Sequence, residues 1–343
     1  GGLVWIKERT NVSNHGLFDT ERGVTKYIHS DGTDAEQTGA TTLTAFNSNG
    51  FSIGSGFVND NNREICSWTF RKAPKFFDVV TYTGNTVGNS AQTISHGLGS
   101  TPGLIIVKRY STADNWIVWH RSITNGFAAL NDTGAWLTNN YTSFITSVGS
   151  TSFTVGESLN TNGASFVAYV FAHNDGDGEF GPDADQDVIK CGSFTTNGSG
   201  VASVNLGFET QWLMYKKSSG TGSWVMYDNM RGMAATGSNI GAILYANGNF
   251  ATLSTTAGDA KATATGIDFS TGEGNTTYIY MAIRRGPMDT PTSATDVFAI
   301  DTLDSTAPGF DSNFVVDMAF ERNVSGASDT RLGTRLLGTS TLR

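Results

Sequence analysis

The sequence of 343 residues predicts an all-β protein built from tandem antiparallel β-sandwich domains. Charged residues make up only 15% of the chain, and its polarity comes instead from Ser, Thr, Asn and the 41 glycines. This composition favours short strands joined by turns over helices. β-Branched and aromatic runs separated by polar turns recur along the chain. The pattern also repeats about every hundred residues, which is the size of a small domain.

The repeat consists of an apolar run that ends in a lysine, followed by a second strand-like run. The lysines of the first three copies are Lys7, Lys108 and Lys216. In the first and third copies the second run leads into an Asp-x-x-Arg-Gly turn, at residues 19–23 and 228–232. The second copy lacks this turn. Two strands and a turn that recur in this way predict a structural unit that is used several times.

Clusters of turn residues place the domain boundaries. We expect one β-sandwich repeat over residues 1–85, a second over 86–187 and a third over 188–300. Residues 301–343 are expected to be the start of an incomplete fourth repeat, so that the chain is a piece of a longer one.

Two strand-like stretches at the repeat junctions resemble each other, at residues 79–85 and 191–198. We interpret them as equivalent strands between domains. Junctions made of strands would stiffen the array, unlike a flexible Gly/Ser tether.

The charge and the cysteine content exclude several classes of protein. A net charge of −9 disfavours nucleic-acid binding through the whole surface, and the absence of an apolar run of 18 residues argues against membrane insertion. The two cysteines, Cys66 and Cys191, lie in strand-like stretches and are expected to be buried free thiols. A disulfide framework is therefore not expected to hold the repeats.

An acidic stretch near the middle of the chain contains the densest group of charges. Its carboxylates repel one another, and a hard cation such as Ca²⁺ would remove that repulsion. The spacing departs from an EF-hand, because Phe180 stands where that loop requires glycine. The stretch is therefore either a calcium site or a solvated acidic linker. The candidate ligands are Asp175, Asp177, Glu179, Asp183, Asp185 and Asp187.

The Asp-x-x-Arg-Gly turns are expected to be closed by local ion pairs. Asp19 would pair with Arg22 and Asp228 with Arg231, and the following glycine would supply a positive φ. Because a single active site seldom needs regular copies, recurrence of the pair favours a structural role over a catalytic one.

Exposed aromatic side chains on a β-sandwich commonly stack on sugars, so the tryptophans are candidates for glycan binding. Trp116 and Trp119 flank an alternating run and are expected in the core. Trp136 lies in a turn-rich stretch and is the better candidate for an exposed glycan-binding residue.

No local motif in the sequence indicates an enzyme. The five histidines lack the spacing of a zinc site, and neither C-x-x-C nor G-x-S-x-G occurs. A carboxylate pair for glycoside hydrolysis stays open, because such pairs are assembled in space and leave no local motif. We therefore expect no catalytic residues.

With these features, the chain resembles repeat-containing virion structural proteins of marine tailed bacteriophages, including cyanophage-type tail-fibre and appendage proteins. The pieces that carry the resemblance are residues 5–7, 17–23, 46–54, 181–194 and 205–213. The resemblance covers nearly the whole chain and supplies no catalytic residues. It implies lectin-like or jelly-roll β-sandwich modules, an oligomeric appendage and a role at the host surface.

The expected function is that of a virion structural protein at the virion surface or outside the cell, in a tail fibre or similar appendage that attaches to the host. We expect a homo-oligomer, with a trimer favoured, that contacts other virion proteins and a host-surface glycan. One alternative is a subunit of an extracellular or capsid-surface filament, whose incomplete repeat is completed by a neighbouring chain. Another is a polysaccharide-degrading enzyme of the appendage.

Overall fold

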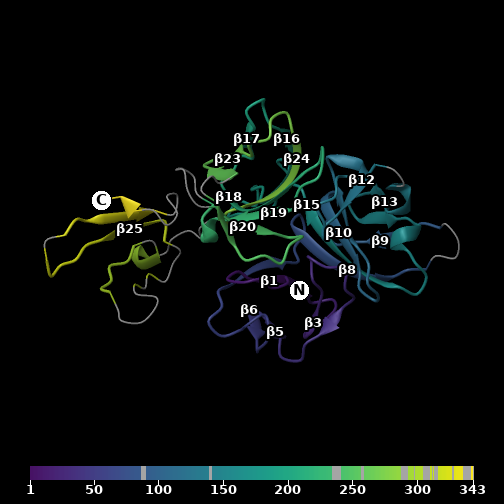
Figure 1. Ribbon diagram of the computed structural model, residues 1–343, viewed down its shortest axis with the longest axis horizontal. Coiled ribbons are helices and arrows are strands. Elements are labelled where there is room, and N and C mark those ends of the chain that lie inside the picture. The colour runs from purple at the N-terminus through teal and green to yellow at the C-terminus, as the bar shows by residue number, and fades with distance from the viewer. Residues whose placement is uncertain are drawn as a thin grey trace.

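The computed structural model is built almost entirely from antiparallel β-strands (Figure 1). In the part of the chain that the structure describes, helix is limited to the 3-10 turns η1 (Tyr141–Ser143), η2 (Glu157–Leu159), η3 (Asn229–Arg231) and η4 (Ala294–Asp296). The predicted all-β class with several antiparallel sheets is confirmed. The structure describes residues 1–85, 90–138, 141–233, 241–255, 259–286, 293–296, 298–303, 310, 312, 316–326, 328–334 and 341–342.

Three units share one strand plan, in which a first strand pairs with a second strand on one side and with a third strand on the other. All of these pairings are antiparallel. In chain order the three strands are β1 (Gly2–Glu8), β2 (Gly16–Asp19) and β7 (Ile65–Arg71) in unit 1; β10 (Pro102–Arg109), β11 (Trp116–His120) and β15 (Ser165–Ala172) in unit 2; and β18 (Thr210–Lys217), β19 (Val225–Asp228) and β24 (Thr277–Arg284) in unit 3.

Smaller strands extend or cover these sheets. In unit 2, β12 (Ile123–Ala129) extends the main sheet; in unit 3, β20 (Gly241–Tyr245) and β21 (Leu253–Thr255) do so. The outer strands are β3 (Lys26–Tyr27), β4 (Gln37–Thr38), β5 (Leu43–Asn47) and β6 (Gly50–Ile53) in unit 1; β9 (Gln92–Ser95), β13 (Ile145–Val148) and β14 (Ser152–Val155) in unit 2; and β17 (Val201–Asn205), β22 (Ala260–Thr263) and β23 (Gly266–Ser270) in unit 3.

One hydrophobic cluster joins the three units. It contains Trp5 of β1, Ile106 of β10 and Met214 of β18, all buried. Neighbouring side chains on a strand point to opposite faces; both faces of β10 contribute to this cluster, whereas on β1 and β18 the alternate residues pack elsewhere. Val4 of unit 1 and Leu213 of unit 3 lie in separate, smaller clusters inside their own units. Each of these first strands is therefore buried on both faces.

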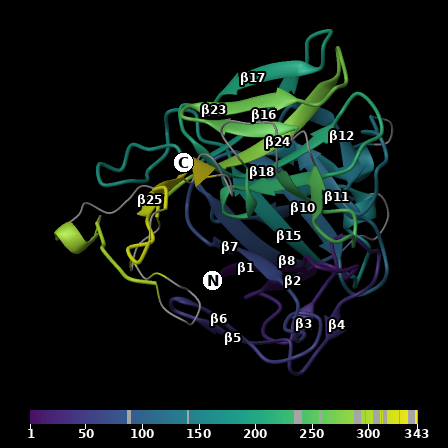
Figure 2. The same cartoon turned by 60° about the vertical axis from the view of Figure 1, so that its left-hand side comes forward.

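The units lie side by side around this shared cluster. Figures 1 and 2 show unit 1 in purple, unit 2 in blue to teal and unit 3 in green, gathered together from both directions of view. The chain thus forms three sandwich-like units around a common core. The helices of the described residues are all too short to cross a membrane.

Strand pairing differs from the expected boundary between the first two repeats. Strand β8 (Phe77–Thr83) precedes residue 85 but pairs with β15, so a boundary after residue 85 would separate it from the sheet of unit 2. Strand β16 (Ile189–Thr195) pairs with β24 in the same way. The two junction strands therefore occupy equivalent positions, each in the sheet of the unit that follows it.

Beyond unit 3 the chain forms a small separate sheet of β25 (Met318–Glu321), β26 (Arg331–Thr334) and β27 (Thr341–Leu342), drawn in yellow in Figure 1. An ion pair between Arg285 and Asp317, 2.7 Å long, links it to the end of unit 3. Of the expected incomplete fourth repeat over residues 301–343, residues 304–309, 311, 313–315, 327, 335–340 and 343 lie outside the described residues.

Strand β8 is predicted to be essential to the packing of unit 2 against unit 1. Phe77 is fully buried, and its ring centroid lies 4.8 Å from that of Phe171 and 5.8 Å from that of Phe70. We expect Phe77→Ala to lower the free energy of unfolding by about 3–5 kcal/mol, measured by urea denaturation. Thr81→Ala, at an exposed position of the same strand, is the control, with an expected change within about 0.5 kcal/mol. A similar loss of unfolding free energy in the two variants would contradict the prediction that β8 is essential to the packing of unit 2 against unit 1.

Candidate functional site

The lysines that define the repeat are buried at the ends of the first strands. Lys7, Lys108 and Lys216 are all fully buried, and each ammonium group donates to backbone carbonyls. Lys108 Nζ, for example, donates to the carbonyl oxygen of Thr33 in unit 1 at 2.8 Å and to that of Asp114. Burial lowers the pKa of Lys108 and that of Lys216 to about 8. These lysines hold loop carbonyls in place.

Eight residues after each lysine, at the start of the second strand, lies a buried aromatic ring that contains a nitrogen. These rings belong to His15, Trp116 and Trp224. The ammonium groups of Lys108 and Lys216 lie 5.9 and 5.6 Å from the two indole centroids, within the range of a cation–π interaction. The repeated spacing thus places one ring nitrogen at the same point of each unit.

Each of these ring nitrogens contacts a backbone carbonyl of a different unit. The acceptors lie at or just after the end of a strand in the neighbouring unit. The contacts are Trp116 Nε1 to His29 O at 2.8 Å, Trp224 Nε1 to Ala129 O at 2.8 Å, and His15 Nε2 to Tyr245 O at 3.0 Å. Unit 2 therefore bonds to unit 1, unit 3 to unit 2, and unit 1 to unit 3. The contacts form a closed ring.

The hydrogen bonds of His15 fix its protonation state. Trp5 Nε1 donates to His15 Nδ1 at 2.8 Å, so the proton of the neutral ring lies on Nε2, which donates to Tyr245 O. Burial, reinforced by the nearby charge of Lys7, lowers the pKa of His15 to about 3. The imidazole is therefore a neutral donor in the same role as the two indoles.

Backbone hydrogen bonds accompany the ring contacts at the same three interfaces. Six residues after each lysine, a backbone N–H donates to a loop of the neighbouring unit. These bonds run from Asp114 N to Thr33 O at 2.8 Å, from Gly222 N to Thr133 O at 2.9 Å, and from Ser13 N to Asn249 O at 2.8 Å. The threefold pattern thus extends from side chains to backbone.

Twelve residues after each lysine lies a second set of contacts between units. The residues at this position are Asp19, His120 and Asp228. Their contacts are Tyr169 OH to Asp19 Oδ2 at 2.9 Å, Trp68 Nε1 to Asp228 Oδ2 at 2.9 Å, and His120 Nε2 to Tyr280 O at 3.1 Å. They connect units 1 and 2, units 3 and 1, and units 2 and 3. A second ring therefore reinforces the first.

The predicted ion pairs of the Asp-x-x-Arg-Gly turns are confirmed. Arg22 Nε donates to Asp19 Oδ2 and Arg231 Nε donates to Asp228 Oδ2, both at 2.6 Å. In each turn the arginine backbone N–H also donates to the other carboxylate oxygen, at 2.9 Å. Gly23 follows with a φ of 88°, which glycine adopts without strain.

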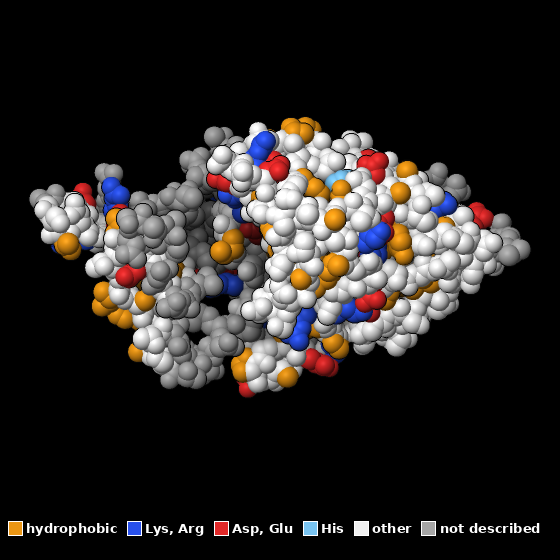
Figure 3. All heavy atoms as spheres, turned by 90° about the horizontal axis from the view of Figure 1, so that it is seen from below, with side chains coloured by type: hydrophobic (Ala, Val, Ile, Leu, Met, Phe, Trp, Pro, Cys, Tyr) orange, Lys and Arg blue, Asp and Glu red, His pale blue; other side chains and the backbone are white. Residues whose placement is uncertain are grey.

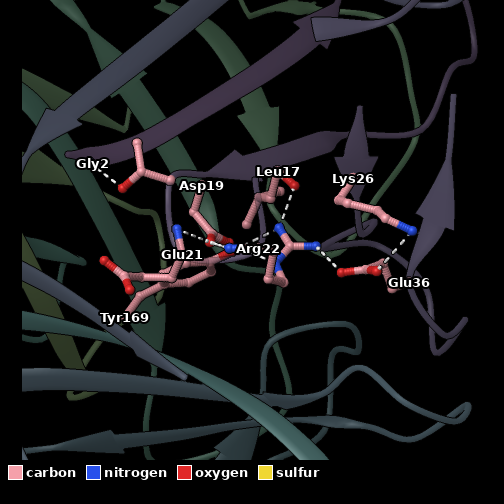
Figure 4. A network of polar contacts seen from close by, with 9 residues as sticks. Gly2, Leu17, Asp19, Glu21, Arg22, Lys26, Glu36 and Tyr169 are labelled. Atoms are coloured by element: carbon pink, nitrogen blue, oxygen red, sulfur yellow. Dashed lines mark hydrogen bonds and ion pairs between the residues drawn. The ribbon is translucent and has the colours of Figure 1, made fainter. Parts of the chain in front are cut away.

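The carboxylate of each turn serves two purposes. Figure 4 shows Arg22 between Asp19, the Leu17 carbonyl and Glu36, with the hydroxyl of Tyr169 reaching the same carboxylate from unit 2. The local ion pair thus holds Asp19 in position to accept from another unit. The Asp-x-x-Arg-Gly turn therefore recurs because its aspartate accepts a hydrogen bond from another unit.

The acidic stretch does not gather its carboxylates around a common point. Asp177 and Glu179 both face Lys75, whose Nζ lies 3.5 and 3.2 Å from their oxygens. Asp183 and Asp185 are exposed. Over the described ranges, no group of three His, Cys, Asp or Glu side chains could hold a metal ion. The expected calcium ligands, Asp175 among them, are therefore not assembled into a site.

Asp187 closes the acidic stretch as a loop. Its carboxylate accepts from the backbone N–H groups of Gly176 at 2.9 Å and Gly178 at 3.0 Å, and lies 3.2 Å from Lys190 Nζ. Burial opposes the ionised form of Asp187, but these contacts together lower its pKa. Backbone donors and lysines thus occupy the place that the sequence suggested for a cation.

The expectation that Trp136 is exposed is wrong. Its side chain is only 8% exposed, and its ring centroid lies 6.4 Å from that of Trp224 in the shared core. Phe127 and Leu137 pair through their backbones, which turns the segment back onto the core. Trp119 lies in the core as expected. Trp136 therefore offers no surface for a sugar.

Sequence reasoning missed His15 and His120 as members of the two rings. Both stand where other copies of the repeat have a different residue, Trp in the first ring and Asp in the second. Counting positions from each lysine would have identified them, because the offsets of eight and twelve residues are constant. Their pairing with other units could not have been read from that spacing.

Removing one donor of the first ring is predicted to destabilise the whole molecule. Trp116→Phe keeps an aromatic ring but leaves the carbonyl of His29 without its donor. Trp136→Phe makes the same change at a buried indole whose Nε1 has no hydrogen-bond partner. In urea denaturation, we expect Trp116→Phe to lower the free energy of unfolding by about 1–3 kcal/mol more than Trp136→Phe. Equal losses would show that the contact between units contributes nothing beyond packing.

The buried histidines predict a loss of stability in mild acid. Burial lowers the pKa of His15 to about 3 and that of His120 to about 4, against 6.5 for an unperturbed histidine. At pH values between the folded pKa and 6.5, each of these histidines is protonated in the unfolded chain and neutral in the folded protein. The free energy of unfolding should therefore fall as the pH drops below about 6.5, by about 1.4 kcal/mol per pH unit for each histidine. Urea denaturation between about pH 7 and pH 5 measures this slope.

The variant His120→Asn separates the contribution of one histidine. The free energy of unfolding of this variant is expected to fall less steeply with decreasing pH than that of the unchanged protein. The difference in slope should be that of one histidine, about 1.4 kcal/mol per pH unit. The slope is informative even if the variant is less stable at neutral pH. A slope equal to that of the unchanged protein would exclude His120 as a source of the acid sensitivity.

Comparison with known proteins gives a family but no described activity. A search among curated proteins finds no match. A family model described as a domain of unknown function, DUF7483, matches residues 1–287. That range includes all three units and both rings, and it covers more than half of the chain. The chain therefore belongs to the DUF7483 family.

Proposed function

We propose that this protein is a structural component of a virion appendage, such as a tail fibre, that displays surface loops toward a host. The observation that supports this proposal is the pair of closed rings, in which recurrent polar residues join the units. These contacts give a rigid body with little local freedom. The resemblance to repeat-containing phage structural proteins supplies the biological setting.

The chemistry of the buried residues favours a structural role over catalysis. General acid–base catalysis at neutral pH works best with a group whose pKa lies near 7 and that can reach a substrate. Lys108 and Lys216 have a pKa of about 8, but both are fully buried and bonded to loop carbonyls. Burial holds the pKa of His15 at about 3 and that of His120 at about 4, so both stay neutral under those conditions. Asp19 and Asp228 are fully engaged by arginine and by donors from other units. These side chains hold the molecule together.

The surface suits contact with neutral polymers such as glycans. Figure 3 shows a face on which charged side chains are few and scattered among neutral polar groups. Three related units present loops at separate places on one body. Several weak contacts with a repetitive host polysaccharide would add through avidity. We therefore keep a host-surface glycan as the proposed partner, bound through loops and not through Trp136.

In the assembled appendage we propose a homo-oligomer, a trimer by preference, in contact with other virion proteins. Both rings are satisfied within one chain, so further copies would join through surfaces outside them. Calcium has no part in this proposal, because the acidic stretch is neutralised by lysines and backbone N–H groups.

The proposal is tested by the mass of the native protein and by its action on polysaccharide. Light scattering is expected to give a discrete oligomer, with the same mass in the presence of a calcium chelator. Surface polysaccharide from marine cyanobacteria is expected to bind the folded protein, but not an unfolded control, without release of reducing sugar ends.

Other outcomes would overturn the proposal in different ways. Release of reducing ends would replace it with a polysaccharide-degrading enzyme. Open-ended polymers would favour a filament subunit. A stable monomer that binds no polysaccharide would exclude the attachment role.

A further inference from the structure

The third strands of the units differ in one respect. β15 and β24 are each paired on both sides, since β8 and β16 supply their outer partners. β7 of unit 1 pairs with β1 on one side and is the last strand of its sheet among the described residues. The equivalent position in unit 1 thus presents a free strand edge.

A hollow of about 450 Å³ lies along this edge of β7. β7 contributes residues 65–70 to its wall, and unit 3 contributes Trp212, Asn229, Arg231 and Ile283. Three polar atoms of these residues, Trp212 Nε1, Asn229 Oδ1 and Arg231 Nη2, are buried and lack hydrogen-bond partners. Buried polar groups normally have partners, so a site with several unpaired ones is suited to a further segment.

The segment that follows unit 3 has the sequence pattern of the two junction strands. β8 follows unit 1, β16 follows unit 2, and residues 298–303 follow unit 3. In all three, large or apolar residues stand at the first, third and sixth positions and Ser or Thr stands at the fifth. The apolar sets are Phe77, Val79 and Tyr82; Ile189, Cys191 and Phe194; and Phe298, Ile300 and Leu303. The fifth-position residues are Thr81, Ser193 and Thr302.

The exposure of these residues differs between the segments. In β16, Ile189, Cys191 and Phe194 are all buried. Phe298, Ile300 and Leu303 are 65%, 86% and 73% exposed. The segment 298–303 therefore exposes three large apolar side chains to solvent, while the edge of β7 in the same chain is unpaired among the described residues.

The rings specify where this segment would fit. In the first ring, the ring nitrogen of unit 2 contacts unit 1, that of unit 3 contacts unit 2, and that of unit 1 contacts unit 3, so the three units follow one another in a cycle. The strand after unit 1 joins the sheet of unit 2, and the strand after unit 2 joins the sheet of unit 3. By the same rule, the segment after unit 3 would join the sheet of unit 1, where β7 is the edge strand on that side among the described residues.

We propose that the free edge of β7 is a strand-binding site and that its occupant is the segment 298–303 of the same chain. The existing junction strands define the register. Val79 lies opposite Tyr169 and Cys191 lies opposite Met281, which are the residues equivalent to Trp68. Ile300 therefore lies opposite Trp68 in the docked state.

The docked register places each apolar residue beside apolar neighbours. Phe298 lies opposite Phe70, and Ile300 opposite Trp68, on the face that packs into the shared core. Leu303 points to the other face, because it is an odd number of residues away. There it lies opposite Ile65, which packs against the separate cluster of unit 1. Ile189 and Cys191 face the shared core and Phe194 faces the cluster of unit 3 in the same alternation.

The segment can reach the site within one chain. Ile283, near the end of β24, already lines the hollow. From Arg284 to Phe298 is 298 − 284 = 14 residues, which can span about 45 Å when extended. A short tether gives an effective concentration of about millimolar, so the same chain is favoured over a second copy.

A single cysteine variant tests this docking with a native thiol. In the docked register Thr302 lies opposite Cys66 of β7. Cross-strand neighbours in an antiparallel sheet have Cα atoms about 4.5–5.5 Å apart, within the range that a disulfide bridges. Diamide at alkaline pH would accept the two electrons and two protons that the thiols lose. We expect Thr302→Cys to form a disulfide with Cys66 inside one chain, identified by mass spectrometry of linked peptides.

The matched control is Asp301→Cys, whose side chain would point to the opposite face of the docked strand. It is expected to link to Cys66 at least about tenfold less than Thr302→Cys. Equal linking by both variants would indicate random collision and would overturn the proposal. Linked dimers would assign the site to a second copy, and the absence of any link would exclude docking; either result also overturns it.

Hydrogen exchange gives a second test without any cross-link. If the segment docks, amides of β7 are protected in the unchanged protein, and Ile300→Asp is expected to speed their exchange by about tenfold or more. Val324→Asp is the control, since Val324 is 95% exposed in the same C-terminal region and has no counterpart in the junction strands. Exchange of β7 that is the same in both variants would contradict the proposal.

Discussion

The hydrogen bond from a buried ring nitrogen of one unit to a backbone carbonyl of another is the constraint on which the rest of the structure depends. A buried carbonyl without a donor costs about 1–3 kcal/mol. No unit can supply the donor for its own acceptor, because Trp116, Trp224 and His15 each reach into a neighbour. Each of these groups is therefore satisfied only when two units meet, and all of them only when the three units have assembled. The shared hydrophobic cluster packs in the centre of that assembly.

Both rings keep their function while the residues in them change. In the first ring an imidazole replaces an indole, and Trp5 fixes its tautomer so that it still donates. In the second ring the change is larger, since His120 stands where the other units have an aspartate. The aspartates accept from side-chain donors, whereas His120 contacts a backbone carbonyl. Donor and acceptor have been exchanged together, so the contact between units is retained.

The sequence predicted what depends on local pattern and missed what depends on distant partners. The all-β class and the ion pair of Asp19 with Arg22 follow from short-range spacing. The continuous apolar run of β1 also carried a signal, because a strand buried on both faces shows no alternation. The partner of Glu179 is Lys75, about a hundred residues earlier in the chain, and no local pattern places that lysine there. Trp136 was misjudged for the same reason, since its turn-rich segment folds back onto Trp224 of another unit.

The buried lysines explain why the loops keep the geometry that the rings require. An ammonium group removed from water is costly unless its protons are bonded, and Lys216 has no carboxylate within ion-pair distance among the described residues. Its Nζ donates instead to the carbonyl of Gly222, whose own N–H donates to Thr133 of unit 2. A loop that moved would leave the charge unbonded, so the lysine penalises any other loop conformation. The hairpin is thereby held where its indole, two residues further along, meets the neighbouring unit.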